Sequence, residues 1–397
     1  MSTTLARDDT RAGAPQGALL VSLSTLAVLG AVLIAPVQPS IARAFAGQPG
    51  LDALVPLSLT VPALAVAVLA PVAGRVVDRV GRLRLLTASL LAYALFGTAP
   101  LWLDSLPAIV TSRALVGVAE AGIMTCCTTL IGDLFDGARR NRYFGLQTVA
   151  TSLSAVVFIA AGGALAAGNW RTPFWLYAVG VLGALAVPAL LREPAPRCAG
   201  ALPPLDRRRL RAPLAVTFVG GLVFYTPIVE LSYVLDALGV RSATTIGAVS
   251  AAAAVATCAG AASFARLARR GPAVLLPLAF ALAGVGLAGV ALAGSVATVL
   301  LCAAVASAGT GLLLPSMLTW TLGDLPLEQR GRATGWWTAA LFGGEFVCPL
   351  VVLALSGLLG ALSWALAGVA LLALALAAAT RSLPARASAP MMTGIAK

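Results

Sequence analysis

Four charged side chains stand inside long apolar stretches of this sequence. Arg113 and Glu120 share one stretch, Glu230 lies in a second and Glu345 in a third. A charged side chain at the centre of a bilayer costs about 2.5–3.5 kcal/mol on insertion scales, so such residues face a cavity or a partner. A carboxylate shielded from water also holds its proton more tightly, and a nearby cation opposes this effect. These residues are therefore candidates for binding a proton or a small charged molecule.

Arg113 and Glu120 are the first candidates because of their spacing. They are seven residues apart, so a helix places both on one face, about 10 Å apart along its axis. This is too far for a direct pair within the helix, but both could line one central cavity. We predict that Glu120 carries a coupled proton or pairs with a cationic substrate, with Arg113 as its modulator. The alternative is a buried ion network with a structural role.

Glu345 and Glu230 are weaker candidates for the same roles. Glu345 stands near mid-depth, where a structural role in helix packing fits the sequence equally well. Glu230 stands toward the outer end of its stretch and could simply reach external water. Aromatic rings could stack on a substrate, although in membrane spans they are more often packing or interface anchors. The aromatic candidates are Tyr225, Tyr233 and Trp320.

Apolar stretches long enough to position these side chains recur along the whole chain. Of 397 residues, 59% are hydrophobic and 11% are charged, which is more apolar than a soluble domain. A helix of about 20 residues crosses a bilayer core of about 30 Å. We predict an all-α polytopic membrane protein with twelve transmembrane helices. They are expected at residues 17–36, 51–72, 85–103, 107–131, 144–166, 172–191, 212–235, 244–265, 272–293, 296–321, 333–356 and 361–380.

The basic residues indicate how the helices are oriented. The net charge is +12, and all but four of the 27 Lys and Arg residues fall on one side of the predicted spans. Following the positive-inside rule, this side and both termini are cytoplasmic. A nucleic-acid site would instead gather basic residues on one soluble face, so we expect no nucleic-acid partner. The four exceptions are Arg43, Arg171, Arg241 and Arg113.

The chain also repeats itself at an offset of about 190 residues. Gly132-Asp133-Leu134 follows the fourth predicted helix, and Gly323-Asp324-Leu325 follows the tenth. Parallel repeats of six helices, related by an axis along the membrane normal, form some transporters. We therefore predict two pseudo-symmetric six-helix bundles. The expected bounds are 1–191 for the first bundle, 192–211 for a cytoplasmic linker and 212–397 for the second bundle.

A glycine- and arginine-rich segment between the second and third predicted helices carries a family resemblance. Residues 74–84 resemble the G-x-x-x-D-R-x-G-R-[KR] signature of the major facilitator superfamily, and residues 113–117 resemble its R-x-x-x-G pattern. The first match rests on Gly74, Asp78, Arg79, Gly81 and Arg82. The chain is similar to bacterial drug and metabolite exporters of that superfamily.

The resemblance implies a role for residues 74–84. Asp78 is expected to bond the end of the eleventh helix and neighbouring arginines, latching the halves in the outward-open state, and Asp133 and Arg142 could join this network. The alternative is that the arginines are only topology anchors. From the residues alone, we expect Gly74 and Gly81 to permit a sharp reversal of the chain.

These observations favour a transporter over an enzyme. The chain has no histidine, which removes histidine-assisted nucleophiles and histidine-bound metals. We predict a secondary active transporter that exports amphipathic or cationic compounds by alternating access. It would use no cofactor, with the proton gradient as driving force. The alternatives are a metabolite carrier for sugars, siderophores or organic anions, in which Arg113 binds the anion, and a non-transporting membrane sensor.

The expected partners are a small-molecule substrate and the lipid bilayer, with the protein working as a monomer. Arginine is used almost to the exclusion of lysine, which is typical of a genome rich in G and C. We therefore place the protein in a bacterial cytoplasmic membrane.

Overall fold

Long helices make up nearly all of the computed structural model, which describes residues 13–193, 207–323 and 325–382. In lipid, backbone N–H and C=O groups must find partners within the protein, and an α-helix satisfies them within one segment. Twelve helices in the described part are long and apolar enough to cross a membrane, and none of the described residues lies in a strand. The predicted fold class is confirmed.

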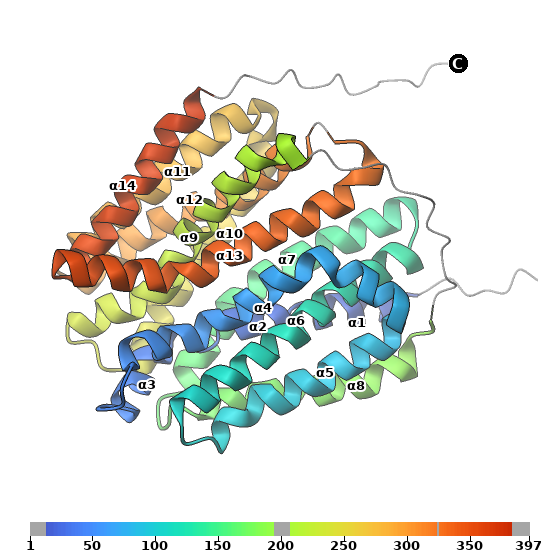
Figure 1. Ribbon diagram of the computed structural model, residues 1–397, viewed down its shortest axis with the longest axis horizontal. Coiled ribbons are helices and arrows are strands. Elements are labelled where there is room, and N and C mark those ends of the chain that lie inside the picture. Colours follow the sequence, from blue (N-terminus) through green and yellow to red (C-terminus); the bar gives the residue numbers. More distant parts are fainter. Residues whose placement is uncertain (1–12, 194–206, 324, 383–397) are drawn as a thin grey trace, which may run out of the picture.

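The helices form two bundles of six spans, which lie side by side in Figure 1. The first span is broken into short helices, whereas most of the other spans consist mainly of one long helix. The elements of the first bundle are α1 (Ala14–Ser24), α2 (Leu26–Val32), η1 (Ala35–Val37), α3 (Gln38–Ala44), α4 (Leu51–Val80), α5 (Arg82–Thr98), η2 (Ala99–Leu101), α6 (Leu106–Leu134), α7 (Gly137–Leu165), η3 (Thr172–Ala178) and α8 (Val179–Leu190).

The second bundle begins after residues 194–206, which lie outside the described residues and contain most of the predicted linker. Its elements are α9 (Arg207–Ala237), α10 (Ala243–Leu267), η4 (Ala268–Arg270), α11 (Pro272–Ala291), α12 (Val296–Leu322), α13 (Leu327–Leu359) and α14 (Leu362–Arg381). We call the face where α1 begins and α14 ends the terminal side, and the other face the opposite side.

The later breaks in the first span, at η1 and α3, follow from its prolines. Pro36 and Pro39 lie at the starts of η1 and α3, and a proline lacks the N–H that an α-helix needs. The span therefore continues as short segments past Gly30 in α2, rather than as one helix. Backbone irregularity of this kind inside a membrane is tolerated where neighbouring protein buries it.

Helix α4 corrects one of the predictions for residues 74–84. It continues without interruption to Val80, well past the predicted end at residue 72, so Gly74 is an ordinary helical residue and the expectation of a reversal there is wrong. The chain turns at Gly81 alone, whose φ of +94° favours glycine. Gly271 takes φ +72° at the corresponding turn of the second bundle. The two turns are 190 residues apart, as the sequence repeat predicts.

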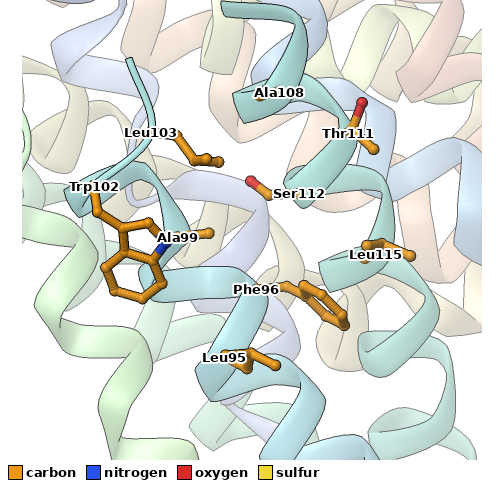
Figure 2. Close-up of a pocket in the computed structure, with 9 residues that line it drawn as sticks. All are labelled: Leu95, Phe96, Ala99, Trp102, Leu103, Ala108, Thr111, Ser112 and Leu115. Atoms are coloured by element: carbon orange, nitrogen blue, oxygen red, sulfur yellow. The ribbon is translucent and has the colours of Figure 1, made fainter. Parts of the chain in front are cut away.

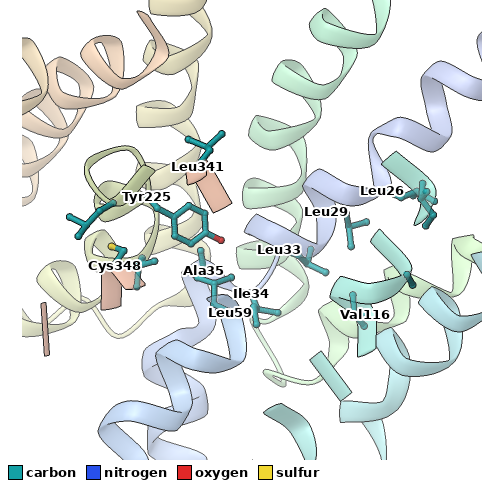
Figure 3. Packing of buried hydrophobic residues seen from close by; sticks show 14 of the residues in the cluster. Leu26, Leu29, Leu33, Ile34, Ala35, Leu59, Val116, Tyr225, Leu341 and Cys348 are labelled. Carbon is teal, nitrogen blue, oxygen red and sulfur yellow. The ribbon is translucent and has the colours of Figure 1, made fainter. Parts of the chain in front are cut away.

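Small residues let the two bundles approach closely near the opposite side. A side chain on Gly163 of α7 would meet the Cα atom of Gly247 of α10 at 2.8 Å. Close backbone approach through small residues is the usual way in which membrane helices pack. Figure 3 shows the middle of the same interface, where the Tyr225 ring from α9 points toward Ala35 of η1. The Tyr225 hydroxyl donates a hydrogen bond to the carbonyl of Ala31.

Candidate functional site

Arg113 lies in the first third of α6 and is completely buried, at 0% exposure. Its Nη2 donates a hydrogen bond of 3.0 Å to the carbonyl of Gly30 in α2. Its guanidinium carbon lies 4.8 Å from the centre of the Tyr177 ring of η3, within the range of a cation–π interaction. Its Nε and Nη1 have no hydrogen-bond partner among the described residues. Two of the nitrogen donors of Arg113 are therefore available to a ligand, in a position shielded from water.

Glu120 lies halfway along α6 and is 3% exposed. Its Oε1 atom has no hydrogen-bond partner among the described residues. The carboxylate packs against Gly30, where even a single added carbon would occupy the position of Oε1. Arg113 and Glu120 thus meet the same glycine of α2 without forming a described ion pair. As the seven-residue spacing predicts, they share a face of α6.

Two tyrosines complete this cluster, and the sequence analysis missed both. Tyr93 of α5 donates a 2.7 Å hydrogen bond to the carbonyl of Leu26, and its ring centre lies 5.0 Å from that of Tyr177. The Tyr177 hydroxyl is buried and has no partner among the described residues. The signal available in the sequence was a tyrosine, with its polar hydroxyl group, inside an apolar stretch. The cluster of Gly30, Tyr93, Arg113, Glu120 and Tyr177, here called the α6 cluster, lies within the first bundle.

Glu345 and Glu230 belong to the second bundle and lie on two helices that pack against each other. Glu345 lies near the middle of α13. Glu230 lies in the half of α9 that is nearer the opposite side of the molecule, and both residues are buried. Between them, the Thr226 hydroxyl and the Cys348 thiol lie 3.5 Å apart. Helical spacing puts Glu230 one turn beyond Thr226 and Glu345 one turn before Cys348. The structure therefore places these carboxylates at the α9–α13 contact, apart from the α6 cluster.

The three aromatic candidates occupy different depths. The Tyr225 hydroxyl donates a hydrogen bond to the carbonyl of Ala31, the residue that follows Gly30. This bond joins the second bundle to the edge of the α6 cluster. The Tyr233 hydroxyl donates to Oε1 of Gln38, 3.0 Å away, nearer the opposite side. Trp320 is buried close to the terminal-side end of α12. The structure does not gather them around one carboxylate.

The signature residues form an ion-pair cluster at the terminal side of the first bundle. Arg82, at the start of α5, bonds Asp78 of α4 through Nη2 at 3.1 Å and Asp133 of α6 through Nε at 3.2 Å. The Asp78 side chain is 63% exposed, and its described ion pair leads to Arg82 rather than to α13. Arg79 and Arg142 are exposed beside this cluster and take part in none of the described ion pairs.

Glu193 is part of this arrangement, although the sequence analysis did not single it out. Its two carboxylate oxygens accept hydrogen bonds from the backbone N–H groups of Arg82 at 2.7 Å and Leu83 at 2.9 Å. A carboxylate is favourable there because the first N–H groups of a helix lack partners within it. Glu193 therefore ties the end of the sixth span to the start of the third. An acidic residue directly after the apolar stretch was the available signal.

A groove between α5 and α6 near the opposite side does not contain these charged residues (Figure 2). It has a volume of about 490 Å³. Apart from Thr111 and Ser112 its lining is apolar, and Trp102 is 56% exposed. Side chains of this kind on the outside of a membrane protein face hydrocarbon, so we do not assign the groove to a charged ligand. Its lining residues are Leu95, Phe96, Ala99, Trp102, Leu103, Ala108, Thr111, Ser112 and Leu115.

The arrangement of helices is similar to that of known transporters. Two solved structures of a bacterial homologue of the human lysosomal transporter Spinster, both inward-facing, one unoccupied and one occupied, have TM-scores of 0.67 and 0.73 to this chain. They cover 94% and 92% of this chain and 96% and 95% of their own, at 17% and 18% identity. Residues 20–216 also match the model of the Major Facilitator Superfamily. The chain belongs to this superfamily.

Relatives within the superfamily are named for drug resistance. The tetracycline resistance protein, class C, of Escherichia coli is 32% identical over 169 residues, which is 41% of either chain. Multidrug resistance protein 2 of Bacillus subtilis (strain 168) is 30% identical over 184 residues, which is 44% of this chain and 43% of the relative. The chain thus spans about two fifths of the length of these relatives.

Proposed function

We propose that this member of the superfamily is a proton-coupled exporter of amphipathic or cationic compounds that works by alternating access. The observation that carries the proposal is the buried Glu120 carboxylate, whose Oε1 has no partner among the described residues. A carboxylate in this setting can take up a proton or pair with a cation, and Arg113 on the same face opposes either event. The names of the relatives support export of drugs.

The contacts around Glu120 support its coupling to movement of the bundles. Gly30 touches Glu120, and the next residue, Ala31, accepts the hydrogen bond from Tyr225 of the second bundle. A change in the charge of Glu120 would therefore act on a segment that also holds the interface. The positive-inside rule supports a cytoplasmic location for the terminal side and for both termini. We place the protein in a bacterial cytoplasmic membrane, with the proton gradient as driving force.

Transport of ethidium, a fluorescent cation, into inside-out vesicles with an imposed pH gradient tests the proposal. We expect the wild type to accumulate ethidium only when the gradient is present. Glu120→Gln should lower this gradient-driven rate by about tenfold or more, because the amide cannot exchange a proton in the relevant range. Asp104→Asn removes one exposed acidic charge and should leave the rate unchanged. Wild-type rates in the Glu120→Gln variant would rule out the assigned role.

Arg113 supports a second candidate, a carrier of organic anions. Its Nε and Nη1 donors are buried and have no partner among the described residues, and a guanidinium is well suited to a carboxylate. Counterflow of radiolabelled benzoate in proteoliposomes separates the two functions. Benzoate counterflow that is lost in Arg113→Lys, without gradient-driven ethidium transport, would favour the anion carrier. Tight binding of either probe without flux would instead favour a membrane sensor.

A further inference from the structure

A second cavity lies between the two bundles near the opposite side, away from the α6 cluster. It has a volume of about 200 Å³. The first bundle contributes residues of α3 and α4 to it, and the second bundle contributes residues of α9, α13 and α14. The lining residues are Ala42, Leu51, Asp52, Val55, Pro56, Glu230, Tyr233, Pro349, Val352, Leu353, Ser356 and Leu362.

Glu230 gives this cavity its chemistry. The residue is 6% exposed, lines the cavity, and has no described hydrogen bond or ion pair. A carboxylate buried without a partner is costly, so such a group binds a proton or a cation. Asp52, which is exposed in the first turn of α4, adds a second acidic side chain to the lining.

The nearby basic residues form no described ion pair with these two acids. Arg43 and Arg241 approach from the two bundles, but both bond to Asp236, at 2.7 Å and 3.0 Å. Tyr233 lines the cavity together with Glu230 and Asp52. The described lining itself contains two acidic side chains and no basic one, which gives the cavity an acidic character.

The rest of the lining defines the kind of cation. Pro56, Pro349 and Val352 supply apolar walls and Tyr233 an aromatic one. Apolar and aromatic walls around a carboxylate suit an organic ammonium group better than a hydrated metal ion, which prefers several oxygen ligands. Liquid water occupies about 30 Å³ per molecule, so a cavity of about 200 Å³ has room for roughly six to seven waters or for a compact organic cation.

We propose that the cavity lined by Glu230, Tyr233 and Asp52 is a binding site for small quaternary or alkylammonium cations, separate from the α6 cluster. Glu230 supplies the countercharge, and the apolar walls enclose the alkyl groups. Because both bundles line it, an occupant bridges them. The site is independent of the proposed export function, since a bound cation there requires neither a gradient nor Glu120.

Equilibrium binding of radiolabelled choline to the purified full-length protein in detergent, without a gradient, tests this proposal. We expect saturable binding that is not displaced by 3,3-dimethylbutan-1-ol, the uncharged isostere. Glu230→Gln should weaken binding by about 10–100-fold, the range for loss of a hydrogen-bonded or paired charge. Asp104→Asn, which removes an exposed acidic charge outside the cavity lining, should bind choline as the wild type does.

A second variant separates loss of the site from loss of the fold. Ala42→Leu fills the cavity from the first bundle without changing a charge and should also abolish choline binding, while its unfolding midpoint stays near that of the wild type. Unchanged binding in Glu230→Gln, equal displacement by the uncharged isostere, or no binding by the wild type would each overturn the proposal. None of these results affects the ethidium experiment, which tests the export function separately.

Discussion

At the scale of single residues, Gly30 is a position of the α6 cluster that has no room for a side chain. It accepts a hydrogen bond from Arg113 through its carbonyl, and its Cα hydrogens face the Glu120 carboxylate. A glycine can serve both contacts because it has no side chain between them. The sequence analysis passed over Gly30 because one small residue among many in an apolar stretch carries no distinguishing pattern.

Gly30→Ala should therefore impair transport more than folding. The added methyl group would overlap Glu120 Oε1, so the carboxylate must move away from α2. We expect gradient-driven ethidium transport to fall by about tenfold, as for other losses of a positioned acid or base. Gly145→Ala, at a glycine with open space around it in α7, is the matched control and should transport normally. Equal rates for both variants would contradict the assigned position of Glu120.

At the scale of elements, the terminal-side cluster joins four helices of the first bundle. Arg82 connects α4, α5 and α6 through its two aspartates, and Glu193 adds the end of α8. The latch between the bundles that the family resemblance implies stays a prediction, because the described bonds of Asp78 remain within one bundle. In this structure Arg82, which is buried, has more described ion-pair partners than Asp78, which is exposed.

Arg82→Ala is thus expected to lower the free energy of unfolding by about 2–3 kcal/mol, because it removes the charged donor from the Asp133 carboxylate, whose side chain is only 9% exposed. Arg79 belongs to the same signature and lies in the last turn of α4. Arg79→Ala should change the free energy of unfolding by less than about 0.5 kcal/mol, because Arg79 is exposed and has no described ion pair. Unfolding by SDS in mixed micelles measures both. Equal effects would show that the Arg82 bonds contribute nothing to stability.

Glu193→Ala tests the connection between the sixth and third spans separately. The substitution removes both acceptors from the first N–H groups of α5, and we expect a loss of about 0.5–1 kcal/mol, small because Glu193 is exposed. Glu193→Gln keeps one oxygen acceptor and should lose less. The same SDS titration distinguishes the two. An alanine variant as stable as the wild type would rule out this capping role.

At the scale of the whole molecule, polar bonds hold the two bundles together near the opposite side. The Arg43–Asp236 ion pair of 2.7 Å crosses from α3 to α9, and the bond between Tyr233 and Gln38 crosses beside it. Thr244 donates to the carbonyl of Gly163 at 3.4 Å between α10 and α7. Alternating access requires these contacts to open in one state of the cycle.

A reversible crosslink between positions 43 and 236 should therefore stop transport. In the double variant Arg43→Cys and Asp236→Cys, a short bifunctional thiol reagent with an internal disulfide joins α3 to α9. We expect ethidium transport to fall to near background and to return when the disulfide is reduced. The single-cysteine variants and the wild type, treated identically, are the controls. Undiminished transport by the crosslinked protein would mean that this side does not open.

The sequence by itself determined the class of protein, the number of spans and the superfamily. A run of apolar residues and a charge inside it are local properties, and a signature such as residues 74–84 is read directly from the chain. The end of α4 was missed because Arg75, Asp78 and Arg79 look like loop residues, although a helix can extend beyond the bilayer with polar side chains in water.

Only the tertiary structure decided which side chains meet. Gly30 and Arg113 are 83 residues apart, and Glu193 reaches α5 across more than a hundred. Such contacts depend on how helices pack, and packing among alanine, leucine and glycine leaves no periodic trace in a single sequence. The four charged residues were therefore found from the sequence, while their separation into an α6 cluster, an α9–α13 contact and an acidic cavity followed from the fold.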